Sequence, residues 1–92
     1  MYYEWDPRKA AGNLRKHGVA FTEAASVFLD PLALTFRDPD HSEGEARFVT
    51  IGRSNRGRVV FVAHVELEDD RVRIISARRA QKREIHGYNE SP

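Results

Sequence analysis

Residues 46–79, ARFVTIGRSNRGRVVFVAHVELEDDRVRIISARR, decide the fold of this chain. Apolar side chains recur at about every second position in three segments, residues 46–53, 58–68 and 71–79. A period of two is typical of β-strands, and the polar links SNRG and Asp-Asp are short enough to be hairpin turns. The stretch therefore predicts three consecutive strands, each antiparallel to the one before it.

The residues upstream of this stretch predict two helices. Asp6 is a natural N-cap for a helix whose first residue is Pro7 and whose end is Gly18. Thr22 is expected to cap a second helix, TEAASVFLD, which Asp30-Pro31 ends.

Further strands and a last helix complete the expected order. Strands are expected at residues 2–5 and 32–38, an acidic loop DPDHSEGE at 38–45, and a polar helix at 77–90, with Ile85 and Tyr88 as its anchors. The order is β-α-α-β-β-β-β-α. We expect one α+β domain over residues 1–92, an antiparallel sheet with helices packed on one face.

The composition limits the class of protein. Of the 92 residues, 40% are apolar and 32% are charged, as in soluble globular domains. The absence of cysteine excludes disulfides and thiolate metal sites. The N-terminus is unlike a signal peptide, and no apolar run approaches the roughly 18 residues that span a bilayer, so a cytoplasmic protein is expected. The histidines are too scattered for a metal-ligand motif, and we expect no metal and no cofactor.

The net charge of +1 hides a gradient along the chain. Residues 1–46 hold five Lys/Arg and eight Asp/Glu, whereas residues 47–83 hold ten and four. Clustering of this kind is expected where phosphate is bound. The alternative is that neighbouring strands display solvated arginines.

The expected turns sort the side chains onto two faces of the sheet. If SNRG is a four-residue loop, Arg53 faces Arg58, and a two-residue Asp-Asp turn then places Val60 opposite Arg79 and Glu66 opposite Arg73. In this register Arg78 points to the core face. That face would carry Phe48, Thr50, Val59, Phe61, Ala63, Val65, Val72 and Ile74. The other face would carry His64 together with Arg47, Arg53 and Arg79.

Such a face has the groups needed to cleave RNA. RNA supplies its own nucleophile, the 2′-hydroxyl, so cleavage needs a base, an acid and cations on the phosphate, and no metal. His64 is the candidate base or acid, and Arg47, Arg53 and Arg79 are the candidate clamp. Each also has a plainer structural role, because strand histidines and cross-strand ion pairs are common.

Three segments carry a resemblance to a known family. They are EWDPRKAAGNLRKHGVAFTEAASVF, DPLALTFRDPDHSEGEARFVTIGRSNRGR, and RIISARRAQKRE with Tyr88. Together they resemble the BrnT family of toxins of type II toxin–antitoxin systems. The resemblance implies a RelE-like fold and a ribonuclease that blocks translation. From the matching segments, the candidate RNA contacts are Lys16, Arg78, Lys82 and Arg83.

The resemblance also implies a partner. This is a BrnA-like antitoxin with a ribbon-helix-helix domain, which would neutralise the toxin in a heterotetramer and bind operator DNA. Two functions stay open on the residues alone: a metal-independent mRNA endoribonuclease, or a non-catalytic module that binds the antitoxin or nucleic acid. Salt-dependent RNA binding without cleavage would favour the module.

Overall fold

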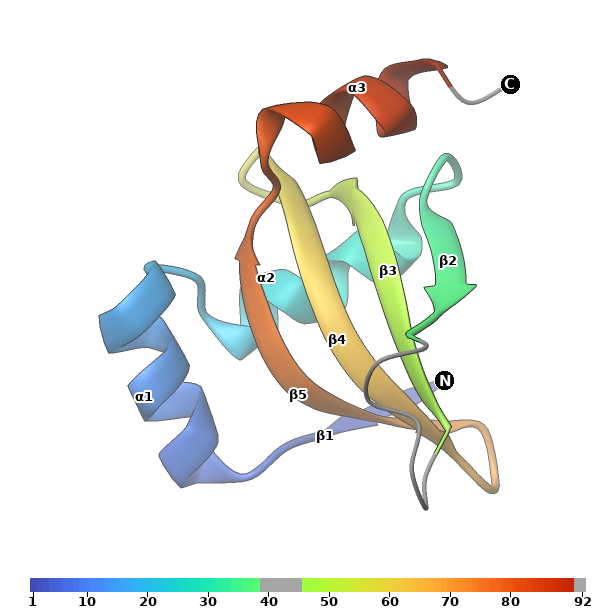
Figure 1. Cartoon of the computed structure of the whole chain (residues 1–92). Helices are drawn as coiled ribbons and strands as arrows, with labels where there is room; N and C mark the ends of the chain where they lie inside the picture. Colours follow the sequence, from blue (N-terminus) through green and yellow to red (C-terminus); the bar gives the residue numbers. More distant parts are fainter. Residues whose placement is uncertain (39–45, 91–92) are drawn as a thin grey trace.

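The computed structural model describes residues 1–38 and 46–90. Apart from Asp38, the expected acidic loop lies outside the described residues. The helices and strands follow the expected order (Figure 1). They are β1 (Tyr2–Glu4), α1 (Pro7–His17), α2 (Phe21–Ser26), the 3-10 helix η1 (Val27–Leu29), β2 (Leu34–Arg37), β3 (Arg47–Arg53), β4 (Val59–Leu67), β5 (Arg71–Arg79) and α3 (Lys82–Glu90).

The five strands form one mixed sheet in the order β1-β5-β4-β3-β2. Strands β2 to β5 are antiparallel, as expected. Strand β1 is parallel to β5, with Tyr2 opposite Arg71, so the expectation of a purely antiparallel sheet is wrong at this edge. The reason is that two helices separate β1 from β2, and the chain places β1 beside the last strand instead of in a hairpin.

Helices cover both faces of the sheet. On one face, Phe21 and Ala24 of α2 pack against Val60 and Val62 of β4. On the other face, the expected anchors Ile85 and Tyr88 attach α3 to an apolar cluster, which confirms their role. That cluster contains Val49, Ile51, Val59 and Phe61. We call these the α1/α2 face and the α3 face; placing all helices on one face was wrong for α3 (Figure 1).

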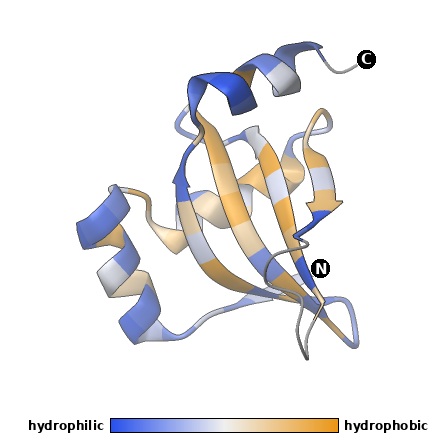
Figure 2. Ribbon diagram, viewed as in Figure 1, coloured by the Kyte–Doolittle hydropathy of each residue, from blue (hydrophilic) through white to orange (hydrophobic). Residues whose placement is uncertain are grey.

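Local signals placed the first helix correctly and the second one less well. The Asp6 carboxylate accepts a 2.8 Å hydrogen bond from the Arg8 amide, and Gly18 ends α1 in the left-handed conformation with φ 70°. Helix α2 begins at Phe21, before the expected cap Thr22, and has no side-chain cap. Burial of the Phe21 ring fixes this start (Figure 2 shows α2 more apolar than α1).

The loop between β3 and β4 is one residue longer than expected. It covers residues 54–58, so Arg53 pairs with Val59 and Ile51 pairs with Phe61. Because side chains alternate, this one-residue slip turns every β4 side chain to the opposite face. Val60, Val62 and His64 therefore face α1 and α2, while the expected core residues of β4 face α3.

The turn between β4 and β5 also has an extra residue. Leu67 pairs with Arg71, and Asp69 and Asp70 in the turn both have positive φ, 61° and 60°. A β-bulge between Ala63 and His64 takes up the difference farther along the pair.

Beyond the bulge the expected register holds, and Val60 pairs with Arg79. Before it the register has shifted, so the expected Glu66–Arg73 pair is wrong and Glu66 lies opposite Val72. Arg73 instead donates a 3.2 Å hydrogen bond to Glu4 of β1.

Candidate functional site

His64 lies inside the protein and not on an open face. It is 1% exposed on the α1/α2 face, with its ring edge-on to Phe28 at 4.9 Å between centroids. The Nε2 atom lies 2.8 Å from the Thr50 hydroxyl, which is 2.7 Å from the Thr35 hydroxyl. The expectation that His64 shares a face with Arg47 and Arg53 is wrong, because of the slip in the β3–β4 register.

The environment of His64 favours the neutral imidazole. Burial lowers the pKa of His64 to about 4. Its Nδ1 atom has no hydrogen-bond partner among residues 1–38 and 46–90. A second proton would therefore enter an apolar site, and RNA has no access to this ring.

Arg47 and Arg53 occupy opposite ends of β3 on the α3 face. A strand of seven residues places its ends about 20 Å apart. Arg53 is exposed, and its Nη1 donates a 2.9 Å hydrogen bond to the Gly57 carbonyl. The two guanidinium groups are therefore not placed to hold one phosphate together with each other or with His64.

The neighbours Arg78 and Arg79 point to opposite faces. As expected, Arg79 lies on the face of Val60 and His64, and Arg78 lies on the face of Phe61; the difference is that α1 and α2 cover the first of these faces. Arg78 lies on the α3 face, 4.0 Å above the centre of the Phe61 ring, and donates two 2.9 Å hydrogen bonds to Glu84. These bonds lower the pKa of the Glu84 carboxyl, although burial opposes the shift. Arg78 therefore holds α3 in place, whereas Arg79 is exposed on the α1/α2 side.

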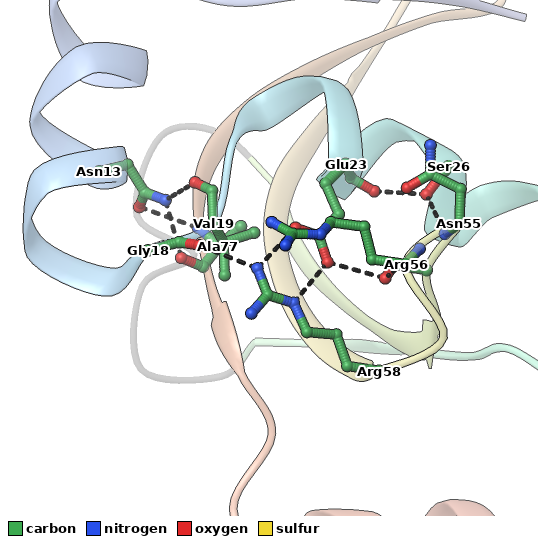
Figure 3. A network of polar contacts seen from close by, with 10 residues as sticks. Asn13, Gly18, Val19, Glu23, Ser26, Asn55, Arg56, Arg58 and Ala77 are labelled. Carbon is green, nitrogen blue, oxygen red and sulfur yellow. Dashed lines mark hydrogen bonds and ion pairs between the residues drawn. The ribbon is translucent and has the colours of Figure 1, made fainter.

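Asn13 brings the end of α1 to the end of β5. Its Nδ2 donates to the carbonyls of Ala77 at 2.8 Å and Val19 at 2.9 Å, and its Oδ1 accepts from the Ala77 amide at 3.1 Å (Figure 3). Lys16 and His17 follow Asn13 by three and four positions, so they lie on the same side of the helix. The C-terminal turn of α1 therefore faces the end of β5 that carries Arg79.

The last turn of α1, the end of β5 and the start of α3 carry basic side chains at this end of the sheet. We call these side chains the basic rim, which comprises Lys16, His17, Arg79, Lys82 and Arg83. All are exposed except His17, which is half-buried. Within residues 1–38 and 46–90, no ion pair joins any of them to a carboxylate. Three of the four expected RNA contacts lie here, and the fourth, Arg78, is occupied by Glu84.

Next to the rim lies an ion pair with a buried carboxylate, which sequence reasoning missed. Glu23 of α2 is 4% exposed and accepts hydrogen bonds from Nε and Nη2 of Arg58, both at 2.8 Å, and from Ser54 Oγ at 2.7 Å (Figure 3). The Arg58 side chain is 23% exposed. Its hydrogen bonds lower the pKa of Glu23, although burial acts in the opposite direction. In the sequence, Glu23 stands beside Ala24 on the apolar side of the second expected helix. A carboxylate at such a position was the available signal that it has a buried partner.

A second, half-buried carboxylate anchors the C-terminal helix. Asp30 accepts hydrogen bonds from the Tyr88 hydroxyl at 2.5 Å, the Arg53 amide at 2.8 Å and the Leu32 amide at 2.9 Å. Burial tends to raise the pKa of Asp30, but these hydrogen bonds lower it overall. The hydrogen bond to Asp30 raises the pKa of Tyr88. This centre joins α3 to the sheet.

In residues 1–38 and 46–90, no group of three or more histidine, aspartate or glutamate side chains is arranged to hold a metal ion. None of the helices in this part of the chain is long and apolar enough to cross a bilayer.

Comparisons with known proteins identify a family. The family model described as ribonuclease toxin, BrnT, of type II toxin–antitoxin systems matches residues 5–84. The crystal structure of the Brucella abortus ribonuclease toxin BrnT superposes with a TM-score of 0.67 and 22% sequence identity. The alignment covers 89% of this chain and 100% of that one, and at this identity the likeness shows the fold. No curated protein sequence matches the chain.

Proposed function

Since this chain belongs to the BrnT family of ribonuclease toxins of type II toxin–antitoxin systems, we propose that it cleaves mRNA without a metal ion and so blocks translation. The observation that carries this mechanism is the basic rim, whose cations make no ion pair with a carboxylate among the described residues. Fixed cations of this kind stabilise charge that develops on a phosphate. Cytoplasmic mRNA is the substrate of this proposal.

The reaction is an attack by the RNA on its own backbone. The 2′-oxygen bonds to phosphorus while the bond from phosphorus to the 5′-oxygen breaks, which yields a 2′,3′-cyclic phosphate and a 5′-hydroxyl. A base removes the proton of the 2′-hydroxyl, and an acid gives a proton to the 5′-oxygen. In this proposal Arg79 and Lys16 hold the non-bridging oxygens, and Lys82 and Arg83 guide the strand.

Proton transfer is assigned to His17 in place of His64. His17 is half-buried within the basic rim, whereas His64 is 1% exposed and enclosed by aromatic rings. Arg47 and Arg53 lie on the α3 face and are left outside the reacting site. If His64→Phe retained cleavage while His17→Ala lost it, this reassignment would be supported; the reverse result would contradict it.

RNA cleavage in the presence of EDTA tests the proposal. Purified protein is incubated with RNA or with translating ribosomes, and 2′,3′-cyclic phosphate ends are counted. Arg79→Ala is expected to lower cleavage on the order of 10²-fold, because a transition-state contact is lost. The matched control is Arg71→Ala at the other end of β5, where the side chain is paired with Glu4. Intact RNA in both settings, or an equal loss in both variants, would contradict the mechanism.

We further propose that the partner is an antitoxin with a ribbon-helix-helix domain. The support is the family, since a type II toxin is paired with a protein antitoxin. The expected assembly is a heterotetramer that binds operator DNA through the antitoxin. Co-expression with the product of the adjacent reading frame, followed by measurement of mass in solution and operator binding, checks this expectation. A toxin that stays alone in solution would contradict it.

A further inference from the structure

Arg58 keeps part of its hydrogen-bonding capacity unused. A guanidinium has five N–H donors. Nε donates to Glu23 at 2.8 Å, and Nη2 donates to Glu23 at 2.8 Å and to the Gly18 carbonyl at 2.9 Å (Figure 3). The remaining nitrogen, Nη1, makes no hydrogen bond to residues 1–38 or 46–90. Two donors of a rigid, planar group are therefore open.

The contacts of Arg58 place it beside the basic rim. Gly18 follows directly after His17, and Val60, two positions beyond Arg58, pairs with Arg79. The side chain of Arg58 points to the α1/α2 side, as its bonds to Glu23 require, and it is 23% exposed. Its open nitrogen thus belongs to the same end of the sheet as the rim.

We propose that Arg58 is a pre-oriented phosphate-binding residue and that Glu23 is its positioning residue; this rests on the proposed ribonuclease function. An arginine fork matches phosphate oxygens, and a fork held in place needs no reorganisation when charge develops. Ser54 fixes the same Glu23 oxygen that receives Arg58 Nε, at 2.7 Å. The carboxylate is therefore held from two sides before any ligand arrives.

Stability alone is a weak reason for this arrangement. Burying the charge of Glu23 costs desolvation energy, and an apolar pair of similar volume often stabilises a fold equally well. A charged pair that leaves two donors open beside uncompensated cations is instead suited to an anionic ligand. The substrate backbone is the ligand of that kind in the proposed reaction.

Glu23→Gln separates positioning from a purely structural role. The variant keeps the side-chain shape and the charge of Arg58 but removes the anion that orients the guanidinium. We expect RNA binding to stay equal or become tighter, because a negative charge near the phosphate is gone, while kcat falls at least about 10-fold. Unchanged kcat in a folded Glu23→Gln protein, or parallel loss of binding and kcat, would overturn the positioning role.

The salt dependence of binding tests Arg58 itself. The probe is a 2′-O-methyl RNA, which lacks the nucleophile and is not cleaved. In the double variant Glu23→Leu/Arg58→Met, the slope of log K against log salt is expected to shrink by about 0.7, the value for one phosphate contact on a single strand. The control Arg71→Met, at the far end of β5, is expected to leave the slope unchanged.

Two controls separate a failure of the Arg58 proposal from a loss of folding and from a failure of the proposed ribonuclease mechanism. Thermal denaturation checks that each variant is folded, and an unchanged slope in a folded double variant would overturn the assignment of Arg58. If the double variant does not fold, Glu23→Gln still decides the positioning role. Wild-type protein that fails to cleave RNA, yet whose salt slope depends on Arg58, would overturn the proposed ribonuclease mechanism and leave the phosphate contact supported.

Discussion

The two ends of strand β5 each carry a pair of arginines, and the two pairs differ in their carboxylate partners. At the start, Arg71 and Arg73 form ion pairs with Glu4 of β1, at 3.1 Å and 3.2 Å. At the finish, Arg78 is taken by Glu84, and Arg79 stands exposed with no carboxylate partner among residues 1–38 and 46–90. Equal local charge therefore gives a structural edge at one end and a candidate ligand surface at the other.

The means of attachment differ as well. The start of β5 is joined to its neighbour by exposed, charged groups, including the ion pair of the N-terminal amine with Asp70 at 3.0 Å. The finish is joined to α1 by the buried, neutral amide of Asn13. Buried hydrogen bonds are insensitive to salt and costly to remove, whereas exposed ion pairs contribute little. A neutral anchor such as Asn13 does not compensate the positive charge of the neighbouring surface. That charge therefore stays available to an anion.

Removing the Asn13 amide is expected to have the largest effect on stability. Asn13→Ala leaves the Ala77 amide and two buried carbonyls without partners, and the free energy of unfolding should fall by about 3 kcal/mol. Urea denaturation measures the change. Asn55→Ala is the matched control, because the hydrogen bond of Asn55 to Ser26 uses its main-chain nitrogen. If Asn13→Ala lowered the free energy of unfolding by no more than Asn55→Ala does, α1 would be held at this end by packing alone.

Acid is expected to act on the middle of the sheet, at the bulge between the two ends. His64 has a folded-state pKa of about 4, below the value of the unfolded chain, so the unfolded state binds more protons as pH falls. Stability should therefore fall as pH drops below about 6.5, by about 2 kcal/mol between about pH 8 and pH 5. Denaturation in this range measures the loss, since carboxylates contribute mainly at lower pH. The folded variant His64→Phe should lack most of this dependence; an identical pH profile would contradict the assignment to His64.

The smallest effect is expected at the start of β5. Glu4→Gln removes the shared partner of Arg71, which is exposed, and of Arg73, which is half-buried, so the unfolding free energy should change by only about 0.5 kcal/mol. The difference from wild type should shrink further in high salt. Thermal denaturation at low and high salt checks both statements. A loss as large as that of Asn13→Ala would erase the distinction between the two ends.

Local chemistry explains what the sequence predicted correctly. The cap at Asp6, the left-handed Gly18 and the period of two each depend on neighbouring residues, and the order of elements followed from them. The register depended on loop lengths that no local signal determined. Two aspartates with positive φ lengthened one turn, and the loop 54–58 gained a residue.

The features of the candidate site divide in the same way, into those that local signals predict and those that depend on residues far apart in the sequence. Exposure of Lys16, Lys82 and Arg83 could be anticipated from their place at helix ends. The partnership of Glu23 with Arg58 joins residues 35 positions apart and depends on how α2 lies over the sheet. The burial of His64 resulted from a one-residue slip in the register of β3 and β4. Because side chains alternate between the two faces, one residue is enough to change the face of His64.

The parallel pairing of β1 with β5 also has a consequence for the order of folding. The hydrogen bond from Arg73 to Glu4 joins residues 69 positions apart, so β1 can pair only after β5 has been synthesised. Contacts of such long range slow folding, and a chain leaves the ribosome N-terminus first. Arg79 is the last residue of β5, and the basic rim is complete only when α3 has begun. A nascent chain therefore lacks its proposed RNA surface until Lys82 and Arg83 at the start of α3 have been synthesised.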